Sequence, residues 1–218
     1  VINPTSKLEM PKKRACEKRA LTSFEKETIS NMHFSDPKKE VFVKTILNFG
    51  LRPGEMLALD KDCFDLENNI LTIKSAVTFV SNTPILKGTK TGAIRKLPIP
   101  NSLVPLYEEY LKDCDKYLFY QGNDKTKLMS KTAFKIFKKG ILMDINERLG
   151  GSIKDDKLNG LTLYTFRHNK ATALYYLDGL SIKAKAAYMG HSVQMLMNIY
   201  SHIDETKECT DVLSECVF

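Results

Sequence analysis

The chain has 218 residues, 43% of them hydrophobic, and none of its apolar runs approaches the roughly 20 residues that a membrane helix requires. Five scattered cysteines without a C-x-x-C pair predict reduced thiols in a cytoplasmic protein and argue against a zinc site: Cys16, Cys63, Cys114, Cys209 and Cys216. The formal net charge of +7 lies in basic blocks at residues 1–26, 83–100 and 125–139, which favours a nucleic-acid-binding face over an evenly solvated surface.

Residues 1–20 hold two prolines and no apolar period, which predicts a basic, extended linker. The chain begins with Val1 and has no basic-then-apolar leader, so we expect a part of a longer, non-exported protein. At the other end, residues 204–218 hold five acidic residues against one lysine, and their apolar positions predict a helix with one apolar face.

Helix-start signals place the first elements of the region between these ends. Thr22 with Glu25 forms a capping box that predicts a helix to about residue 33. Asp36-Pro37 predicts the start of a second helix, which ends near Phe49, and a short helical turn follows over residues 54–59. Asn101 and Ser130 are predicted caps of later helices, and the full set of later helices covers residues 101–116, 130–149, 165–178, 181–189, 192–198 and 204–215.

Between these helical regions the apolar period changes. Short apolar runs on both sides of residues 67–69 predict a hairpin. A glycine-rich turn over residues 87–92 then leads into a third predicted strand that contains Ile94, Leu97 and Ile99. The fold predicted from these elements is mainly α with one small three-stranded antiparallel sheet.

Four short stretches hold the candidate reactive residues. They are Gly50-Leu51-Arg52-Pro53-Gly54-Glu55 between two helices, Gly88-Thr89-Lys90-Thr91-Gly92 at a strand turn, Thr165-Phe166-Arg167-His168 at a helix start, and Met189-Gly190-His191-Ser192 followed by Ile199-Tyr200-Ser201-His202. Paired guanidinium groups suit the oxygens of a phosphate, and a nearby acid can protonate a departing hydroxyl. A tyrosine, with an unperturbed pKa of roughly 10, can form a phosphate ester once its proton is removed.

Taken together and in this order, the four stretches resemble the tyrosine recombinase family, which includes phage and conjugative-element integrases and chromosome-dimer resolvases. The resemblance covers residues 20 to 208, nearly the whole chain. It implies the tyrosine recombinase catalytic-domain fold over residues 21–203, double-stranded DNA as the substrate, and no cofactor or metal. It also implies an upstream DNA-binding domain that is joined through residues 1–20 and completes a clamp around the duplex.

The resemblance implies a role for each of five residues. Arg52 and Arg167 would clamp the scissile phosphate, and His191 would donate a hydrogen bond to one of its oxygens. Lys90 would protonate the departing 5′-hydroxyl. Tyr200 would attack the phosphorus and leave a 3′-phosphotyrosyl link, which a second 5′-hydroxyl reverses without any high-energy cofactor.

Four further residues are candidates for supporting or phosphate-contacting roles: Tyr164, His168, Glu55 and Lys87. Glu55 is expected to brace the site from behind, and Lys87 is the alternative to Lys90. Tyr164 departs from the family pattern, which usually has a histidine three residues before the second arginine. A phenol is a poor base near neutral pH, so the general base stays open between Tyr164, His168, water and the phosphate. We hypothesise an active enzyme in which Tyr164 positions the phosphate.

The expected function is a site-specific DNA recombinase, an integrase of a mobile element or phage, that assembles as a tetramer on DNA without a membrane or small-molecule partner. The tail at residues 204–218 is expected to dock on a neighbouring protomer, and packing on its own domain is the alternative. The lysine-rich helix over residues 131–139 fits a solvated face as well as it fits contact with DNA phosphates. Two other functions stay open: a catalytically silent DNA-binding relative, and a topoisomerase-like enzyme that nicks one strand.

Overall fold

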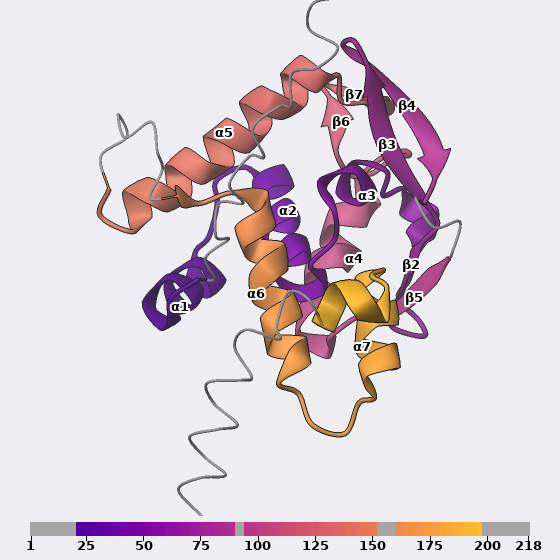
Figure 1. Ribbon diagram of the computed structural model, residues 1–218. Helices are drawn as coiled ribbons and strands as arrows, with labels where there is room; N and C mark the ends of the chain where they lie inside the picture. Colours follow the sequence, from indigo (N-terminus) through magenta and orange to yellow (C-terminus); the bar gives the residue numbers. More distant parts are fainter. Residues whose placement is uncertain (1–20, 90–93, 152–159, 198–218) are drawn as a thin grey trace, which may run out of the picture.

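The computed structural model describes residues 21–89, 94–151 and 160–197 (Figure 1). Within these ranges the chain is mainly helical and contains small antiparallel sheets, which confirms the predicted fold class. The predicted linker at residues 1–20 and the predicted tail at residues 204–218 lie outside these ranges, as do Lys90 and Tyr200.

Three helices at the start of this region follow the predicted caps. α1 (Ser23–Asn31) begins after Thr22, whose hydroxyl accepts from the Glu25 amide while the Glu25 carboxylate accepts from the Thr22 amide. α2 (Pro37–Phe49) begins after Asp36, which accepts from an amide of the first turn. α2 ends at Gly50, whose φ of 61° is a left-handed conformation that favours glycine, and the chain turns there into α3 (Pro53–Leu57).

A three-stranded antiparallel sheet follows, as predicted. After a short 3₁₀ turn, η1 (Lys61–Cys63), the strands β1 (Phe64–Asp65) and β2 (Ile70–Ile73) form the expected hairpin. β5 (Arg95–Pro98) pairs with the other edge of β2, so the order is β1-β2-β5. In this register Leu71 lies opposite Leu97 and Ile73 lies opposite Arg95, which fixes where the Arg95 side chain begins.

Two further hairpins were not predicted. β3 (Ser75–Val80) pairs with β4 (Thr83–Gly88), so residues 87 and 88, which were predicted to begin a turn, end a strand instead. β6 (Tyr120–Gln121) pairs with β7 (Asp124–Leu128), so the prediction that only helices follow residue 100 was wrong. Most side chains of β4 and β7 are exposed or half-buried, which explains why neither strand shows the apolar alternation of a half-buried strand.

The later helices match the predicted ones with shifted ends. Asn101 begins a 3₁₀ turn, η2 (Asn101–Leu103), and the α-helix α4 (Val104–Lys112) starts only after it, so Asn101 does not cap that helix directly. α5 (Lys131–Arg148) is capped by Ser130 as predicted. α6 (Leu163–Tyr175) begins two residues earlier than predicted because Thr162 caps it, and α7 (Ile182–Met189) follows Ser181. Residues 193–197 are also helical.

The main core surrounds α2, and α6 packs against this helix beside it (Figure 1). Phe42 of α2 meets the rings of Phe119 at 5.0 Å and Phe137 of α5 at 5.4 Å between centroids. A smaller cluster joins α6, α7 and the helical residues after α7: Ala171, Leu174, Ala186, Met189 and Leu196. Since α7 also contacts β5, the ends of α2, α6, α7 and β5 are held at one place. Among the described helices, none is long and apolar enough to cross a bilayer.

Candidate active site

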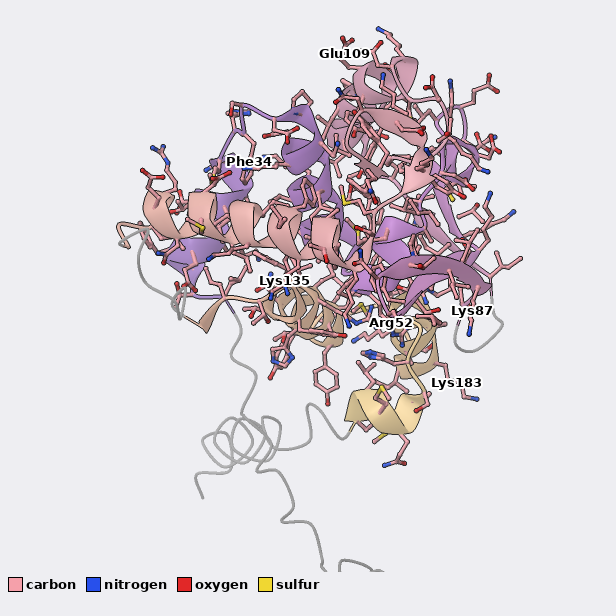
Figure 2. The ribbon with its side chains drawn as sticks, turned by 90° about the horizontal axis from the view of Figure 1, so that it is seen from above. Phe34, Arg52, Lys87, Glu109, Lys135 and Lys183 are labelled. Carbon is pink, nitrogen blue, oxygen red and sulfur yellow. The ribbon has the colours of Figure 1, made fainter. Side chains whose placement is uncertain are left out.

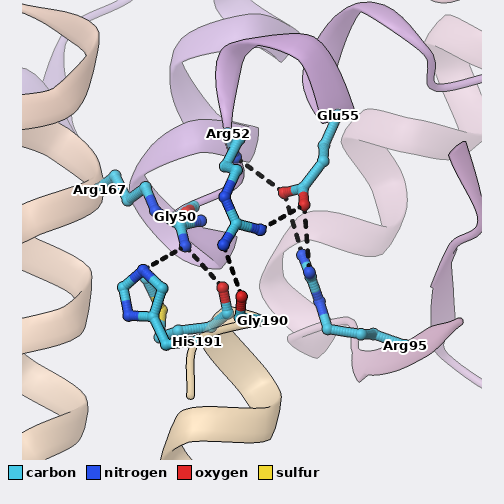
Figure 3. A network of polar contacts seen from close by, with 8 residues as sticks. Gly50, Arg52, Glu55, Arg95, Arg167, Gly190 and His191 are labelled. Atoms are coloured by element: carbon cyan, nitrogen blue, oxygen red, sulfur yellow. Dashed lines mark hydrogen bonds and ion pairs between the residues drawn. The ribbon is translucent and has the colours of Figure 1, made fainter. Parts of the chain in front are cut away.

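Polar side chains from four separate parts of the sequence meet at this place (Figure 3). Arg52 caps the start of α3, Arg95 begins β5, and Arg167 lies one turn into α6. The fourth part is the turn after α7, where Gly190 has a φ of 62° and His191 follows it. Two of the four predicted stretches therefore supply an arginine each, and a third supplies the turn between them.

Arg52 is held through its backbone amide and through its guanidinium. Its amide donates to Oε2 of Glu55 over 2.9 Å, and its Nη1 donates to Oε1 of the same carboxylate over 2.9 Å. Its Nη2 donates to the Gly190 carbonyl over 2.5 Å. The Arg52 side chain is nevertheless 29% exposed, whereas that of Glu55 is 1% exposed, so Glu55 lies behind Arg52 as seen from solvent.

Arg167 is buried and donates to three groups. Its Nη1 reaches the Gly50 carbonyl over 2.6 Å, and its Nη2 reaches the Met189 carbonyl over 2.6 Å. Burial, and then the charge of Arg52, lower the pKa of Arg167 to about 10, so the group stays charged near neutral pH. Arg52 and Arg167 therefore converge on two consecutive carbonyls of the same turn, at Met189 and Gly190.

His191 completes the site from the end of that turn. Its Nε2 lies 2.7 Å from Nη2 of Arg167, and a guanidinium nitrogen can only donate. Nε2 is therefore the acceptor, and the neutral ring carries its proton on Nδ1. Burial, and then the charges of Arg167, Arg52 and Arg95, lower the pKa of His191 to about 4. Nδ1 is buried and has no hydrogen-bond partner in the described part of the chain.

Arg95 was not predicted from the sequence; it is buried and donates with both Nη groups to the Glu55 carboxylate. Its position in β5 held a usable signal. Side chains alternate in and out along a strand, so Arg95 shares the inward side with Leu97 while Lys96 and Pro98 are exposed. A basic residue at an inward position predicts a buried acidic partner. The site thus holds three guanidinium groups and one carboxylate, an arrangement that favours an anion.

The remaining predicted residues lie at different distances from this centre. Tyr164 lies one helical turn before Arg167 and is 53% exposed. Its phenol is close enough to act on the pKa of Arg167. His168 is half-buried on α6, and Lys87 is exposed on β4 (Figure 2). Lys90 and Tyr200 lie outside the described residues, so their predicted roles stay predictions. In the described ranges, no group of three His, Cys, Asp or Glu side chains is placed to hold a metal ion.

Known sequences match this chain over most of its length. Residues 19–207 match the Phage integrase family. A tyrosine recombinase XerC of Caldanaerobacter subterraneus is 26% identical over 212 residues, which are 94% of this chain and 53% of the relative. A tyrosine recombinase XerA of Pyrococcus furiosus is 24% identical over 83% of this chain and 57% of the relative. The chain therefore spans about half the length of the curated relatives it matches.

Solved structures share the fold at low sequence identity. The Tn1549 transposon integrase in complex with transposon right end DNA has a TM-score of 0.68 and 20% identity over 90% of this chain and 66% of that one. The XerA recombinase has a TM-score of 0.63 and 22% identity over 96% of this chain and 68% of that one. These similarities confirm the fold that the four sequence stretches implied.

Proposed function

Because this chain belongs to the phage integrase family, we propose that it is the catalytic part of a site-specific DNA recombinase, an integrase of a mobile element or phage. It cleaves and rejoins DNA strands through a 3′-phosphotyrosyl intermediate. The observation that carries the proposal is the convergence of Arg52 and Arg167 on the turn that bears His191. Arg52 and Arg167 are far apart in the sequence, and their meeting places two positive charges beside one neutral histidine.

The same geometry suits the phosphate of a DNA strand. A scissile phosphate beside this turn would accept hydrogen bonds from Arg52 and Arg167, whose guanidinium groups compensate the charge that grows on the phosphate oxygens in the transition state. His191, whose ring lies against Arg167 at the end of this turn, is the proposed third donor. A neutral histidine is sufficient here because it only donates a hydrogen bond.

In the proposed step the phenol of Tyr200 gives its proton to the general base, for which Tyr164, His168, water and the phosphate are the candidates. Its oxygen forms a bond to phosphorus while the bond between phosphorus and the 5′-oxygen breaks. Lys90 gives its proton to the departing 5′-oxygen. Attack by a 5′-hydroxyl on the phosphotyrosine reverses the step and releases Tyr200, so the number of phosphodiester bonds is conserved. Arg52 and Arg167 hold the phosphate in both directions. Tyr200 follows His191 by nine positions in the sequence.

The proposed partner is double-stranded DNA, and the proposed assembly is a tetramer on that DNA, in which residues 204–218 dock on a neighbouring protomer. The basic blocks of the sequence and the DNA named for the Tn1549 structure support the first proposal. The tetramer rests on the resemblance. Deletion of the chain after Asp204 tests the docking, because synaptic assembly on DNA should then be lost.

Covalent trapping on a labelled, nicked attachment-site duplex tests the proposed chemistry. We expect the wild-type chain to give a protein–DNA adduct that resists denaturation, and Tyr200→Phe to give none. Tyr164→Phe should lower the cleavage rate if its hydroxyl positions the phosphate, and an unchanged rate would refute that role. A wild type that binds the duplex but never forms an adduct would be the silent relative. Relaxed circles without joined recombinants would indicate the topoisomerase-like alternative.

A further inference from the structure

We propose that Arg95 is a positioning residue for strand cleavage, which acts on the phosphate through Glu55 and Arg52 and does not touch DNA. The inference rests on the proposed function of the site. It adds a third arginine to the two that the sequence motifs point to, and it assigns that arginine a separate task.

The Glu55 carboxylate is shared evenly between two arginines (Figure 3). Its Oε1 accepts from Nη1 of Arg52 over 2.9 Å and from Nη1 of Arg95 over 3.1 Å. Its Oε2 accepts from the Arg52 amide over 2.9 Å and from Nη2 of Arg95 over 3.0 Å. Arg95 therefore fixes both oxygens by a bidentate contact, and the orientation it imposes is the one in which Arg52 is held at two points.

Arg95 and Arg52 differ in burial, which suits them to different roles. The Arg95 side chain is 7% exposed and the Arg52 side chain is 29% exposed. Gly190 closes the space beside Arg95, because an added Cβ at this glycine would overlap the Arg95 guanidinium and would come within 3.1 Å of Nη1 of Arg52. Arg95 thus faces Glu55 and the turn after α7, while Arg52 keeps a solvent-facing side from which it can reach a phosphate.

Charge balance gives Arg95 its effect on the reaction. Burial would raise the pKa of Glu55, but the hydrogen bonds and charge of Arg95, and then those of Arg52, outweigh it and lower the pKa. Glu55 is therefore an anion that needs a cation. When Arg95 neutralises it, the charge of Arg52 remains available for the phosphate; without Arg95, Arg52 is the cation that must neutralise Glu55.

A substrate without charge at the scissile position distinguishes this positioning role of Arg95 from a purely structural role. The test compares the cleavage rates of two nicked duplexes. One has a phosphodiester at the scissile position, and the other has a methylphosphonate there. The methylphosphonate lacks the negative charge that Arg52 compensates. We expect Arg95→Gln to slow phosphodiester cleavage by about 100-fold, the scale of a small misplacement of a catalytic group. The methylphosphonate should be cleaved within about threefold of the wild-type rate, as with Arg52→Gln.

Two further variants complete the design. Arg95→Lys keeps the charge but cannot span both carboxylate oxygens, so an intermediate loss of about 10-fold on the phosphodiester is expected. If Arg95→Gln does not fold, the rates of Arg95→Lys on the two substrates answer the same question. Lys96→Gln removes one positive charge from the exposed side of the same strand and should leave the ratio of the two rates unchanged.

Each outcome decides between the possibilities. A parallel loss on both substrates would mean that Arg95 only supports the fold, and the inference would be overturned while the proposed function stands. A wild type that cleaves neither duplex would overturn the proposed function and the inference with it. A selective loss on the charged phosphodiester supports both.

Discussion

At the scale of single residues, His191 links the charge of the site to the stability of the protein. Its pKa falls from 6.5 to about 4 because the ring is partly buried and faces three arginines. Below pH 6.5 the unfolded chain binds a proton that the folded chain does not, so the free energy of unfolding decreases as the pH falls from 6.5 towards 4. Between pH 7 and pH 5 this ring should cost about 1–2 kcal/mol of stability, allowing for its partial exposure.

Urea denaturation of wild type and His191→Asn at both pH values measures this contribution. Other groups titrate in both proteins, so the relevant quantity is the difference between them. The wild type should lose more stability than the variant on acidification. An equal loss in the two proteins would show that His191 does not keep its proton off in the folded state.

Gly190 is the residue on which the closeness of the arginines depends. Its φ of 62° already disfavours a side chain, and an added Cβ would overlap Arg95. Gly122 has a φ of 57° with nothing near its added Cβ, so it offers a matched control. We expect Gly122→Ala to cost about 1 kcal/mol, and Gly190→Ala to cost more and also to abolish adduct formation. Equal costs in denaturation, with cleavage retained, would contradict the close packing of Gly190.

At the scale of elements, the tip of the β3–β4 hairpin is hydrogen-bonded to the start of α5. The Asn82 side-chain oxygen accepts from the Thr132 amide over 2.9 Å, and the Asn82 carbonyl accepts from the Lys131 amide over 3.1 Å. Ser130 caps the next free amide, at Ala133. The hairpin therefore supplies part of the N-terminal cap of a helix that lies far from it in sequence.

Asn82→Ala should lower the free energy of unfolding by about 1 kcal/mol, because it leaves the Thr132 amide without its side-chain acceptor. Asn82→Asp keeps an acceptor and places a negative charge at the helix start, so its stability should match or exceed that of the wild type. Thermal denaturation distinguishes the variants. Identical melting curves for Asn82→Ala and wild type would show that the Asn82 side chain does not stabilise the start of α5.

Local chemistry explains which elements the sequence predicts. The Thr22–Glu25 capping box, Asp36-Pro37 and Ser130 act within a few residues, so their helices begin where expected. β7 and β4 are held by backbone pairing within exposed hairpins, and exposed strands carry no apolar period to read. Contacts such as the one between Asn82 and α5 join residues 50 positions apart and cannot be read from local pattern.

At the scale of the whole molecule, the basic charge of +7 leaves open which face meets DNA. In Figure 2, Lys135 of α5 and Arg52 lie towards one side of the molecule and Glu109 towards the opposite side. Three lysines along α5 are exposed: Lys131, Lys135 and Lys139. If this face binds DNA, each phosphate contact adds about 0.9 to the slope of log affinity against log salt concentration.

Replacing these three lysines by glutamine should therefore lower the slope by roughly 2–3. The control replaces three exposed lysines elsewhere, Lys61, Lys112 and Lys116, which leaves the net charge of the two variants equal. Fluorescence anisotropy at several salt concentrations provides the slopes. Equal slopes for the two triple variants would identify the α5 lysines as a merely solvated face.

Part of the candidate site could be predicted because its motifs are short runs of neighbouring residues, which can be recognised without knowing the fold. Arg52 and His191 each lie at a helix boundary and Arg167 lies one turn into α6, and the fold brings them together. Arg95 carries no motif, and its role depends on the register of β5 against β2 and on the burial of Glu55. Burial of this kind is a property of the packed molecule, so the sequence indicates it only through the alternation of one short strand.

We propose that Tyr200 is the nucleophile and that Arg52 and Arg167 hold the phosphate it attacks. Mass spectrometry of a protease digest of the trapped adduct tests this claim most directly. We expect one modified peptide, with the mass of a nucleotide 3′-phosphate on Tyr200. The same modification on another residue, such as Tyr164, or an adduct that survives in Tyr200→Phe, would contradict it.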